Sequence, residues 1–223
     1  MIERVYRQVE KCGKFTPTQI IVATDDTRIE SLVKSFGGNA VMTSIHHRSG
    51  TERIWEVLKH RDFDAVINIQ GDEPAVPIQL IATIHDELDT GKYGVVTPAH
   101  FSHSYENYLS KNVVKVVLTR DSRALYFSRS PLPFMEKTDF NGFHHHIGIY
   151  GYLKSSLEQF FTLPPSPLEG TEKLEQLRFL ENNIGIKVVI SQTPSLGVDT
   201  PEDVAVVEKM LELAATGNHH NGG

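Results

Sequence analysis

The stretch Val-Ile-Asn-Ile-Gln-Gly-Asp-Glu-Pro, residues 66–74, joins a short, mainly apolar run to an abrupt polar exit. The run has the β-branched character of a buried strand, and Pro74 prevents the strand from continuing. Asp72 and Glu73 therefore follow the strand directly. Ligands of open α/β sheets bind beyond the carboxyl ends of the strands, so this exit is a candidate site. The pairs Gly-Asp and Glu-Pro are equally typical of an ordinary turn.

The segments on either side of this stretch alternate between strand and helix patterns. Apolar runs predict strands, and apolar residues at intervals of three and four predict helices. Strands are expected at 19–24, 40–44, 64–70, 93–99 and 186–191, with further strands in series at 113–119, 123–128 and 146–153. Helices are expected from Ile2 to Val9 and at 27–36, 51–60, 78–88, 168–183 and 201–214. This alternation predicts an α/β fold with a mostly parallel, mixed sheet and helices on both faces.

Composition narrows the class of protein. The 223 residues suffice for one large α/β domain or two small ones, and 22 basic against 28 acidic residues give a formal charge of −6. That balance argues against general nucleic-acid binding, which uses a basic face. A single cysteine, Cys12, is consistent with a reducing, cytosolic setting. No apolar run reaches the roughly 18 residues of a membrane span. The last residues, 216–223, are expected to form a disordered tail.

Two acidic residues are candidate metal ligands. Asp72 follows the strand described above, and Asp199 lies in Leu-Gly-Val-Asp-Thr-Pro-Glu-Asp, residues 196–203. Carboxylate oxygens suit Mg²⁺, which combines one or two carboxylates with substrate phosphates. Asp199 or Thr200 is also a suitable cap for a helix that starts at Pro201. If Thr200 is the cap, Asp199 is available for another role.

Two further segments carry candidate binding residues. Residues 46–53, His-His-Arg-Ser-Gly-Thr-Glu-Arg, lie between a predicted strand and a predicted helix. Ser49, Gly50 and Thr51 place amide donors at the helix start, which suits an anion or a base edge. An ordinary capped helix entry has the same pattern. Arg129 follows the strand Ala-Leu-Tyr-Phe-Ser, where a guanidinium either forks onto a carboxylate or remains solvated.

Histidines and helical polar residues complete the set of candidates. His144 and His146, in a run of three histidines, share one face of a predicted strand, so a zinc site is one interpretation. The sequence offers no nearby cysteine and no third ligand at the spacing of a zinc site. Glu175 and Gln176 fall in the middle of a predicted helix, where such residues usually face solvent.

Nine short segments, taken together and in order, resemble the 3-deoxy-manno-octulosonate cytidylyltransferase family, also called CMP-Kdo synthetases. They are IIVATDD, HHRSGTER, VINIQGDEP, NVVKVVLTRD, ALYFSRSPLP, HIGIYGY, PSPLE, EKLEQLR and GVDTPEDV. Each is weak alone, but the ordered set is specific and covers the chain from its first predicted helix to its last. The resemblance implies a Rossmann-like nucleotidyltransferase fold. It implies one domain over residues 1–215, with a mixed sugar-binding and dimerisation portion around 101–165.

The resemblance also implies an activity. A member of this family transfers CMP from CTP to Kdo, an eight-carbon acidic sugar, and releases pyrophosphate. Its product serves lipopolysaccharide biosynthesis. The chain is therefore expected to be a Mg²⁺-dependent, cytoplasmic homodimer that takes CTP and Kdo as substrates and binds neither nucleic acid nor membrane.

The same resemblance assigns roles position by position. Asp72 and Asp199 match the catalytic carboxylates that hold magnesium. The positions that match the nucleotide site are Ser49, Gly50, Thr51, Arg53, Gln70 and Asp72, with Gln70 at the boundary between nucleotide and sugar. The positions that match the Kdo site are Arg129, His146, Tyr150, Glu175 and Gln176.

One part of the family pattern is missing from this sequence. The family begins with a strand and a basic loop resembling Ile-Pro-Ala-Arg-x-x-Ser-x-Arg-x-Pro-Gly-Lys, which cradles the CTP phosphates, and Met1 aligns just after it. A fold built from βα units should begin with a strand, so the predicted opening helix indicates the same gap. The sequence therefore predicts an N-terminally truncated version with weak or no CTP turnover, unless Arg48 or Lys115 replaces the loop. Lys115 is otherwise expected to be a strand residue whose amine snorkels towards solvent.

Two alternative functions remain open from the sequence. A CMP-sialate synthetase performs the same chemistry on a nine-carbon acid, but it carries a Gln-Pro-Thr-Ser-type turn in place of Gln-Gly-Asp-Glu-Pro. An amino-sugar analogue of Kdo is a further substrate of the same kind. The second alternative is a catalytically impaired remnant that binds a sugar or a partner without turnover.

Overall fold

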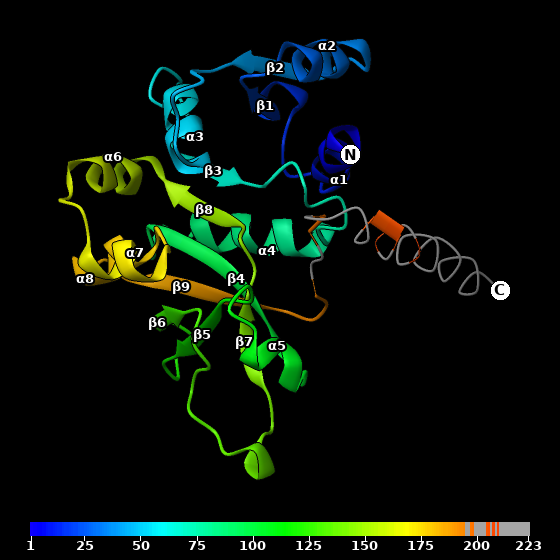
Figure 1. The fold of residues 1–223 in the computed structure, drawn as a ribbon. Coiled ribbons are helices and arrows are strands. Elements are labelled where there is room, and N and C mark those ends of the chain that lie inside the picture. The colour runs from blue at the N-terminus through cyan, green and yellow to red at the C-terminus, as the bar shows by residue number, and fades with distance from the viewer. Residues whose placement is uncertain (195–196, 199–203, 206, 208, 210–223) are drawn as a thin grey trace. The chain divides into compact units, whose positions relative to one another are not determined.

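The structure is a computed structural model that describes residues 1–194, 197–198, 204–205, 207 and 209 (Figure 1). It divides into two compact units. The first unit contains Met1–His46, Ile69–Ile81 and the described residues after Pro194. The second unit contains His47–Asn68 and Ala82–Pro194. The expectation of one domain over residues 1–215 stays a prediction.

The first unit is built around a two-stranded parallel sheet. Its elements are α1 (Ile2–Lys11), the 3₁₀ turn η1 (Pro17–Gln19), β1 (Ile21–Thr24), α2 (Thr27–Ser35) and β2 (Asn39–Met42). Asp26 caps α2 by accepting the backbone N–H of Arg28 at 2.8 Å. The buried side chains Tyr6 and Val33 form a small core where the chain turns between α2 and β2. The expected opening helix, β1, α2 and β2 are thus all present.

The second unit contains most of the sheet. Its elements up to the middle of the chain are α3 (Gly50–Leu58), β3 (Ala65–Asn68), α4 (Ile78–Asp89), β4 (Val95–Ser102), α5 (Tyr105–Leu109), β5 (Lys115–Leu118) and β6 (Ala124–Ser128). They continue with the 3₁₀ turn η2 (Lys137–Asp139), β7 (Phe143–His146), β8 (Tyr150–Leu153), α6 (Lys154–Thr162), α7 (Pro167–Glu172), α8 (Leu177–Glu181) and β9 (Ile186–Ser191). The first four residues of α4 belong to the first unit.

The strands of the second unit form a mixed sheet in the order β3-β8-β4-β7-β5-β6, with β9 paired to β4. β3, β4 and β9 run in the same direction. β9 is parallel to β4, and β8 lies between β3 and β4 and is antiparallel to both. The predicted α/β class and mixed sheet are confirmed. The description "mostly parallel" is wrong for the described pairings, because β6, β7 and β8 run antiparallel to their neighbours.

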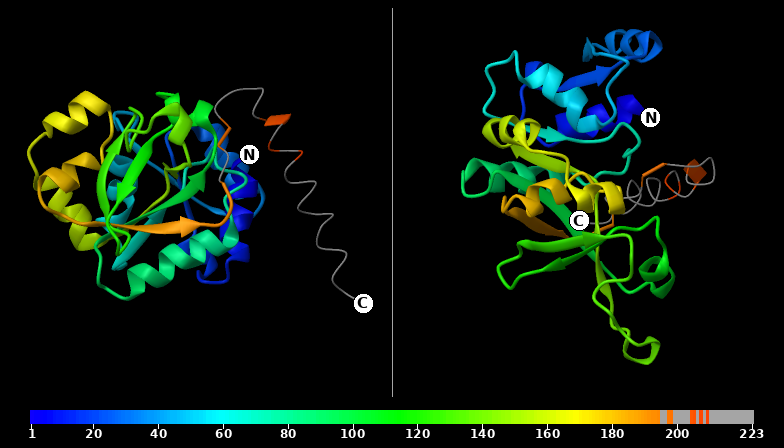
Figure 2. Two further views of the ribbon diagram at one scale, coloured as in Figure 1. Left: turned by 90° about the horizontal axis from the view of Figure 1, so that it is seen from below. Right: turned by 60° about the vertical axis from the view of Figure 1, so that its left-hand side comes forward.

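Successive residues of β8 point to opposite faces of this sheet. Tyr152 is buried in the main hydrophobic core with residues of α3, α6 and α8. Gly151, which must point to the opposite face, lies directly against Ile84 and Leu88 of α4. Figure 2 shows α4 and the α6–α8 group on different sides of the strands.

Gly151 is expected to tolerate no larger residue. A Cβ added there stands 2.6 Å from Leu88 Cδ1 and 2.7 Å from Ile84 Cγ2, so Gly151→Ala should lower the free energy of unfolding by about 1–3 kcal/mol. Gly148→Ala is the matched control, because a Cβ at that position has no neighbour within 4 Å. Urea unfolding of both variants checks the prediction. Equal stabilities would show that α4 moves away from β8 without cost.

Two predicted elements are each divided in the structure. The strand expected at 146–153 is interrupted at residues 147–149, giving β7 and β8, which both pair with β4, whereas β8 also pairs with β3 and β7 with β5. The helix expected at 168–183 ends at Lys173, which adopts a left-handed conformation with φ of 57°, and resumes at Leu177. The short α5 and the helix α6 had no expected counterpart. The remaining strands and helices before residue 195 match their predicted positions within a few residues.

The end of the chain is described only in part. Residues 204, 205, 207 and 209 are helical, and the rest of the helix expected at 201–214 lies outside the described residues. The expected tail, 216–223, lies outside them as well. Among the described helices, none has the length and apolar character needed to cross a bilayer.

Candidate active site

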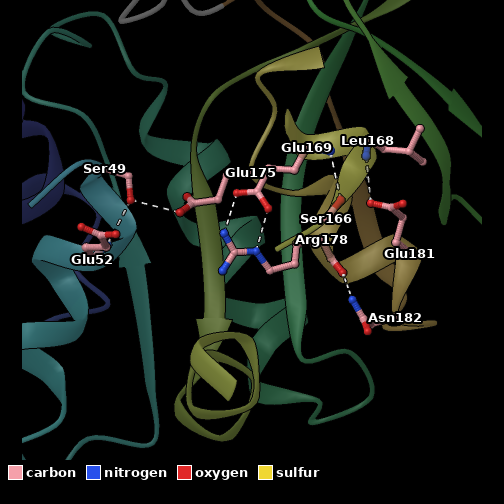
Figure 3. A network of polar contacts seen from close by, with 9 residues as sticks. All are labelled: Ser49, Glu52, Ser166, Leu168, Glu169, Glu175, Arg178, Glu181 and Asn182. Carbon is pink, nitrogen blue, oxygen red and sulfur yellow. Dashed lines mark hydrogen bonds and ion pairs between the residues drawn. The ribbon is translucent and has the colours of Figure 1, made fainter. Parts of the chain in front are cut away.

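Ser49 begins α3 and links it to a distant part of the chain. Its hydroxyl accepts the backbone N–H of Glu52 at 3.2 Å, which confirms the predicted capped helix entry. The same hydroxyl donates to Glu175 Oε1 at 3.0 Å (Figure 3). Thr51, in the first turn of the helix, is buried. The structure therefore brings the predicted nucleotide loop and a predicted sugar residue into direct contact.

Glu175 and Gln176 do not lie in mid-helix. They occupy the turn between α7 and α8, where Gln176 is the N-cap residue of α8 and is buried. Burial raises the pKa of Glu175, and the neighbouring hydroxyls of Thr51 and Ser49 oppose this rise. The expectation of a solvated helix face is thus wrong. The interruption of the helix turns both side chains inward.

An ion pair stabilises this turn. Arg178 donates to both carboxylate oxygens of Glu169, at 2.7 and 2.6 Å, and its guanidinium lies 4.2 Å from the ring centre of Phe160. Ser166 caps α7 by accepting the N–H of Glu169 at 3.0 Å. Figure 3 shows Glu169 and Arg178 facing each other while Glu175 points away towards Ser49. A bidentate pair between half-buried groups fixes the geometry of the segment that carries Glu175.

A row of aromatic side chains extends from β8 to β7. Tyr150 and Tyr152 stack with ring centres 5.5 Å apart, and Tyr150 lies 5.4 Å from His146. His146 is buried, and its Nε2 lies 2.9 Å from Thr97 Oγ1. Because the Thr97 hydroxyl donates to the Ile149 carbonyl at 2.8 Å, it accepts from His146, which assigns the proton to Nε2. Burial lowers the pKa of His146 to about 3, so the ring is neutral.

The Tyr150 hydroxyl is the buried polar group of this row that lacks an ordinary partner. Its oxygen is inaccessible to solvent and makes no hydrogen bond of normal geometry within the described part of the chain. Thr97 interacts with it electrostatically but has already committed its proton to Ile149. Burial raises the pKa of Tyr150, so the phenol remains a donor at neutral pH. A buried donor of this kind needs a partner beyond the described protein atoms, which either a water molecule or a ligand supplies.

Arg129 follows β6, as predicted, and its half-buried side chain donates to backbone carbonyls. Its Nε donates to the carbonyl of Glu172 at 3.0 Å and its Nη1 to that of Lys111 at 3.2 Å. No ion pair joins it to a carboxylate among the described residues. Lys115 does not snorkel, because it is fully buried and its amine donates to backbone carbonyls. That expectation was wrong, and an enclosed amine does not suit the phosphate-binding role either.

Asp72 and Gln70 belong to the first unit and lie in the turn that follows β3. Gln70 is exposed, and its carbonyl accepts the N–H of Glu73 at 3.2 Å. The Asp72 carbonyl accepts the N–H of Val198 at 2.8 Å, which places Val198 beside Asp72. Asp199 itself lies outside the described residues. A half-buried carboxylate in a turn pinned by this contact offers the hard oxygen donors that Mg²⁺ prefers.

The structure gives no support for a zinc site formed by the histidine run. Within the described part of the chain no three His, Cys, Asp or Glu side chains are grouped as metal ligands would be. His144 packs edge-on against Phe101, whereas His145 lies 4.9 Å from His100. Each histidine of the run is thus engaged with a different neighbour.

Several residues of this region were missed by the sequence analysis. Glu172 and Tyr152 contact predicted site residues directly, and Thr97 fixes the tautomer of His146. Glu172 has the sequence context of a solvated helical glutamate, so nothing local distinguishes it. Tyr152 follows Tyr150 at the strand interval of two residues, and this spacing was the available signal.

Solved structures define the class of protein to which this fold belongs. The chain matches a 4-diphosphocytidyl-2C-methyl-D-erythritol synthase from Anaerococcus prevotii with a TM-score of 0.62 at 16% identity, covering 95% of this chain and 88% of that one. It matches a CMP:2-keto-3-deoxy-manno-octonic acid synthetase complexed with CTP with a TM-score of 0.86 at 36% identity, covering 97% of this chain and 88% of that one. The fold is therefore that of the nucleotidyltransferases.

Sequence comparison identifies the family within this class. The family model described as cytidylyltransferase matches residues 1–188. The 3-deoxy-manno-octulosonate cytidylyltransferase of Syntrophobacter fumaroxidans is 44% identical over 97% of this chain and 88% of the relative. That of Thermodesulfovibrio yellowstonii is 42% identical over 95% of this chain and 88% of the relative. The chain belongs to the cytidylyltransferase family, in the branch of the 3-deoxy-manno-octulosonate cytidylyltransferases.

Proposed function

We propose that this protein activates Kdo with CTP, giving CMP-Kdo and pyrophosphate for lipopolysaccharide biosynthesis. The observation that carries the proposal is the hydrogen bond between Ser49 and Glu175. It joins the start of α3, which matches the cytidine loop, to the turn that matches the sugar site. The relatives named above, which carry this activity in their names, support the same assignment.

The second unit offers groups suited to an acidic sugar. Arg129 presents a guanidinium that has no carboxylate partner in the described part of the chain and matches the charge and planar shape of a sugar carboxylate. Neutral His146 and the buried phenol of Tyr150 are suited to orient the sugar by hydrogen bonds. Glu175 and Gln176 supply acceptors and donors for its hydroxyls.

The reaction forms one bond and breaks another at the α-phosphorus of CTP. The anomeric hydroxyl of the sugar attacks, loses its proton, and becomes the oxygen that joins the sugar to CMP, while pyrophosphate leaves. Such phosphoryl chemistry depends mainly on alignment and charge neutralisation. The residues of this chain contribute by holding the sugar and the cytidine in a fixed orientation. The start of α3, with Ser49, Gly50, Thr51 and Arg53, is proposed to bind the nucleotide.

Mg²⁺ is the cofactor proposed for this reaction, with Asp72 and Asp199 as its protein ligands and Gln70 between nucleotide and sugar. When bound, such an ion neutralises phosphate charge and acidifies a coordinated hydroxyl. The proposal is supported by the oxygen chemistry of the Asp72 turn and by the contact of Val198 with Asp72.

We also propose that the protein is a cytoplasmic homodimer that associates through the portion around 101–165. This portion exposes large apolar side chains, with Phe101 45%, Leu109 53%, Leu125 58% and Phe134 81% accessible. Isolated apolar residues on a surface are common, but four in one portion favour an interface. Light scattering coupled to gel filtration measures the assembly directly. A monomeric mass at micromolar concentration contradicts the dimer.

Pyrophosphate release with CTP, Mg²⁺ and Kdo tests the proposed activity. We expect release that requires Kdo and is not restored by a nine-carbon sialic acid. Dependence on the sugar is the deciding observation, because it separates transfer to Kdo from hydrolysis of CTP. Calorimetric titration with Kdo and with CTP runs beside it, and Kdo binding is expected. Release without sugar, or a preference for the sialic acid, would contradict the proposal.

A further inference from the structure

Two oppositely charged side chains hold the backbone of Arg129 from either side. The Arg129 N–H donates to Glu172 Oε2 at 2.9 Å, and the Arg129 carbonyl accepts Lys115 Nζ at 2.6 Å. Glu172 ends α7, and Lys115 begins β5. One residue of the chain is thus fixed at both its peptide groups by charge-assisted hydrogen bonds, which are shorter and stronger than neutral ones.

Glu172 also fixes the strand end next to Arg129. Its Oε1 accepts the Ser128 hydroxyl at 2.6 Å and lies 3.5 Å from the Tyr126 hydroxyl. Its own carbonyl accepts the Nε–H of Arg129 at 3.0 Å. A single glutamate therefore contacts the backbone and side chain of Arg129 as well as its chain neighbour. Ser128 in turn accepts the N–H of Ser130 at 2.9 Å, so the whole exit of β6 is ordered through Glu172.

Lys115 completes the arrangement from the interior of the sheet. It has no accessible surface, and its amine donates to the carbonyls of Ser110 at 2.6 Å and Val113 at 2.8 Å as well as to that of Arg129. Burial and the nearby charge of Arg129 lower its pKa, while Glu172 raises it. A buried amine whose three donors all meet carbonyls fixes those carbonyls in space and has no donor left for a ligand.

The guanidinium of Arg129 is thereby fixed without being neutralised. Its Nε and Nη1 donate to the carbonyls of Glu172 and Lys111, which carry no formal charge. Both carboxylate oxygens of Glu172 are used by the backbone and by Ser128, so this carboxylate serves the peptide rather than the guanidinium. Such an arrangement leaves a positioned, planar cation ready for an external carboxylate.

We propose that Glu172 and Lys115 are positioning residues that orient Arg129 for the carboxylate of the acidic sugar. The inference rests on the proposed function, which supplies the ligand. It adds to that function a pair of residues which act through Arg129 and do not touch the sugar. Glu172 is the better residue to test, because it lies at a helix end, whereas replacement of the enclosed Lys115 threatens the fold itself.

A double-mutant cycle with Kdo as the titrant tests the proposal. Arg129→Ala and Glu172→Ala are each expected to weaken Kdo binding about tenfold or more, because a small displacement of a binding group is costly. The double variant should bind no more weakly than Arg129→Ala alone, since Glu172 then has nothing to position. CTP affinity is expected to change little in all three. Glu172→Gln, which retains one acceptor, should recover part of the affinity.

Glu181→Ala is the matched control. The Glu181 carboxylate accepts the N–H of Leu168 at 3.2 Å, joining α8 to α7 as Glu172 joins α7 to β6, but it does not contact Arg129. Its loss should leave Kdo binding within about twofold of the parent, as for most substitutions away from a special contact. Independent, additive losses from Glu172→Ala and Arg129→Ala would overturn the proposal, as would an equal loss from Glu181→Ala.

An Arg Nε–H resonance provides a readout that does not need the sugar. The signal of Arg129, assigned with Arg129→Lys, should be shifted and slow to exchange in the parent protein because Nε–H donates to the backbone carbonyl of Glu172. Glu172→Ala keeps this carbonyl but removes the carboxylate that holds the Arg129 N–H and Ser128, so it should move the signal, and Glu181→Ala should not. An unmoved signal in Glu172→Ala overturns the positioning role. If the parent binds no Kdo, the proposed function fails, and the resonance alone still decides whether Glu172 holds Arg129.

Discussion

Acidification from pH 7 to pH 5 is expected to lower the free energy of unfolding of the second unit by about 3–4 kcal/mol through two histidines of β7. Burial lowers the pKa of His146 to about 3 and, together with the charges of His100 and Lys115, that of His145 to about 4. Both rings are therefore neutral when folded but become protonated below about pH 6.5 when unfolded. The unfolded chain then binds more protons, so lowering the pH favours unfolding.

The pH range of this effect is set by the pKa values of the two histidines in the folded and the unfolded protein. The stabilisation is fully present above about pH 6.5 and is lost progressively towards pH 4 for His145 and pH 3 for His146. Burial also lowers the pKa values of His100 and His144, which adds to the loss. Glu175 acts in the opposite direction, because its raised pKa lets the folded state bind a proton first, and it offsets a part.

Urea unfolding at several pH values measures this slope. His145→Gln removes one titrating ring and is expected to flatten the dependence by roughly a third to a half over this range. His60→Gln is the control, because His60 is exposed beyond the end of α3 and its replacement should leave the slope unchanged. A parent protein equally stable at pH 7 and pH 5 would mean that the histidines of β7 are solvated in solution.

Asp72→Asn is expected to reduce sugar-dependent pyrophosphate release to the level of the no-sugar control. Loss of a metal carboxylate removes several kcal/mol of charge stabilisation, and 4 kcal/mol corresponds to roughly a thousandfold in rate. Asparagine has nearly the same shape and leaves the carbonyl of residue 72 free to accept Val198 as before. The loss should therefore arise from the charge, and the unfolding midpoint should change little.

Glu73→Gln is the matched control for this substitution. It neutralises the adjacent carboxylate of the same turn, and we expect less than about a tenfold change in release, in keeping with a role in shaping the turn. Mn²⁺ titration followed by electron paramagnetic resonance separates metal binding from turnover, with weaker binding expected for Asp72→Asn only. Equal losses in both variants would assign the metal to the turn as a whole and not to Asp72.

Local patterns predicted those parts of the fold that depend on neighbours in sequence. The periodicity of α1, α2 and α3 and the apolar runs of β1, β3 and β9 are set by burial on one face or two, and these elements lie where expected. The break at Lys173 depends on tertiary contacts instead. A lysine with positive φ has no local signal, and it occurs where Glu172 binds β6 and Leu174 enters the core.

The same distinction between local sequence signals and tertiary contacts applies to the residues of the candidate site. Ser49 was placed correctly because a helix cap is a local feature, and Arg129 because a strand exit is one. The inward turn of Glu175 was not predicted, since it depends on the division of a helix that reads as continuous. Lys115 was misjudged because lysine is rarely buried, and the carbonyls that enclose it come from three separate positions in the chain.

The insertion of β8 between β3 and β4 has a consequence for how the chain is made. Ala65 to Asn68 find their partner in Tyr150 to Leu153, so some eighty residues must leave the ribosome before this ladder can close. Until then β3 and β4 have open edges, and their apolar residues are exposed in the nascent chain. The second unit therefore completes its sheet late in synthesis, and a product that stops before Tyr150 lacks the strand that joins its two halves.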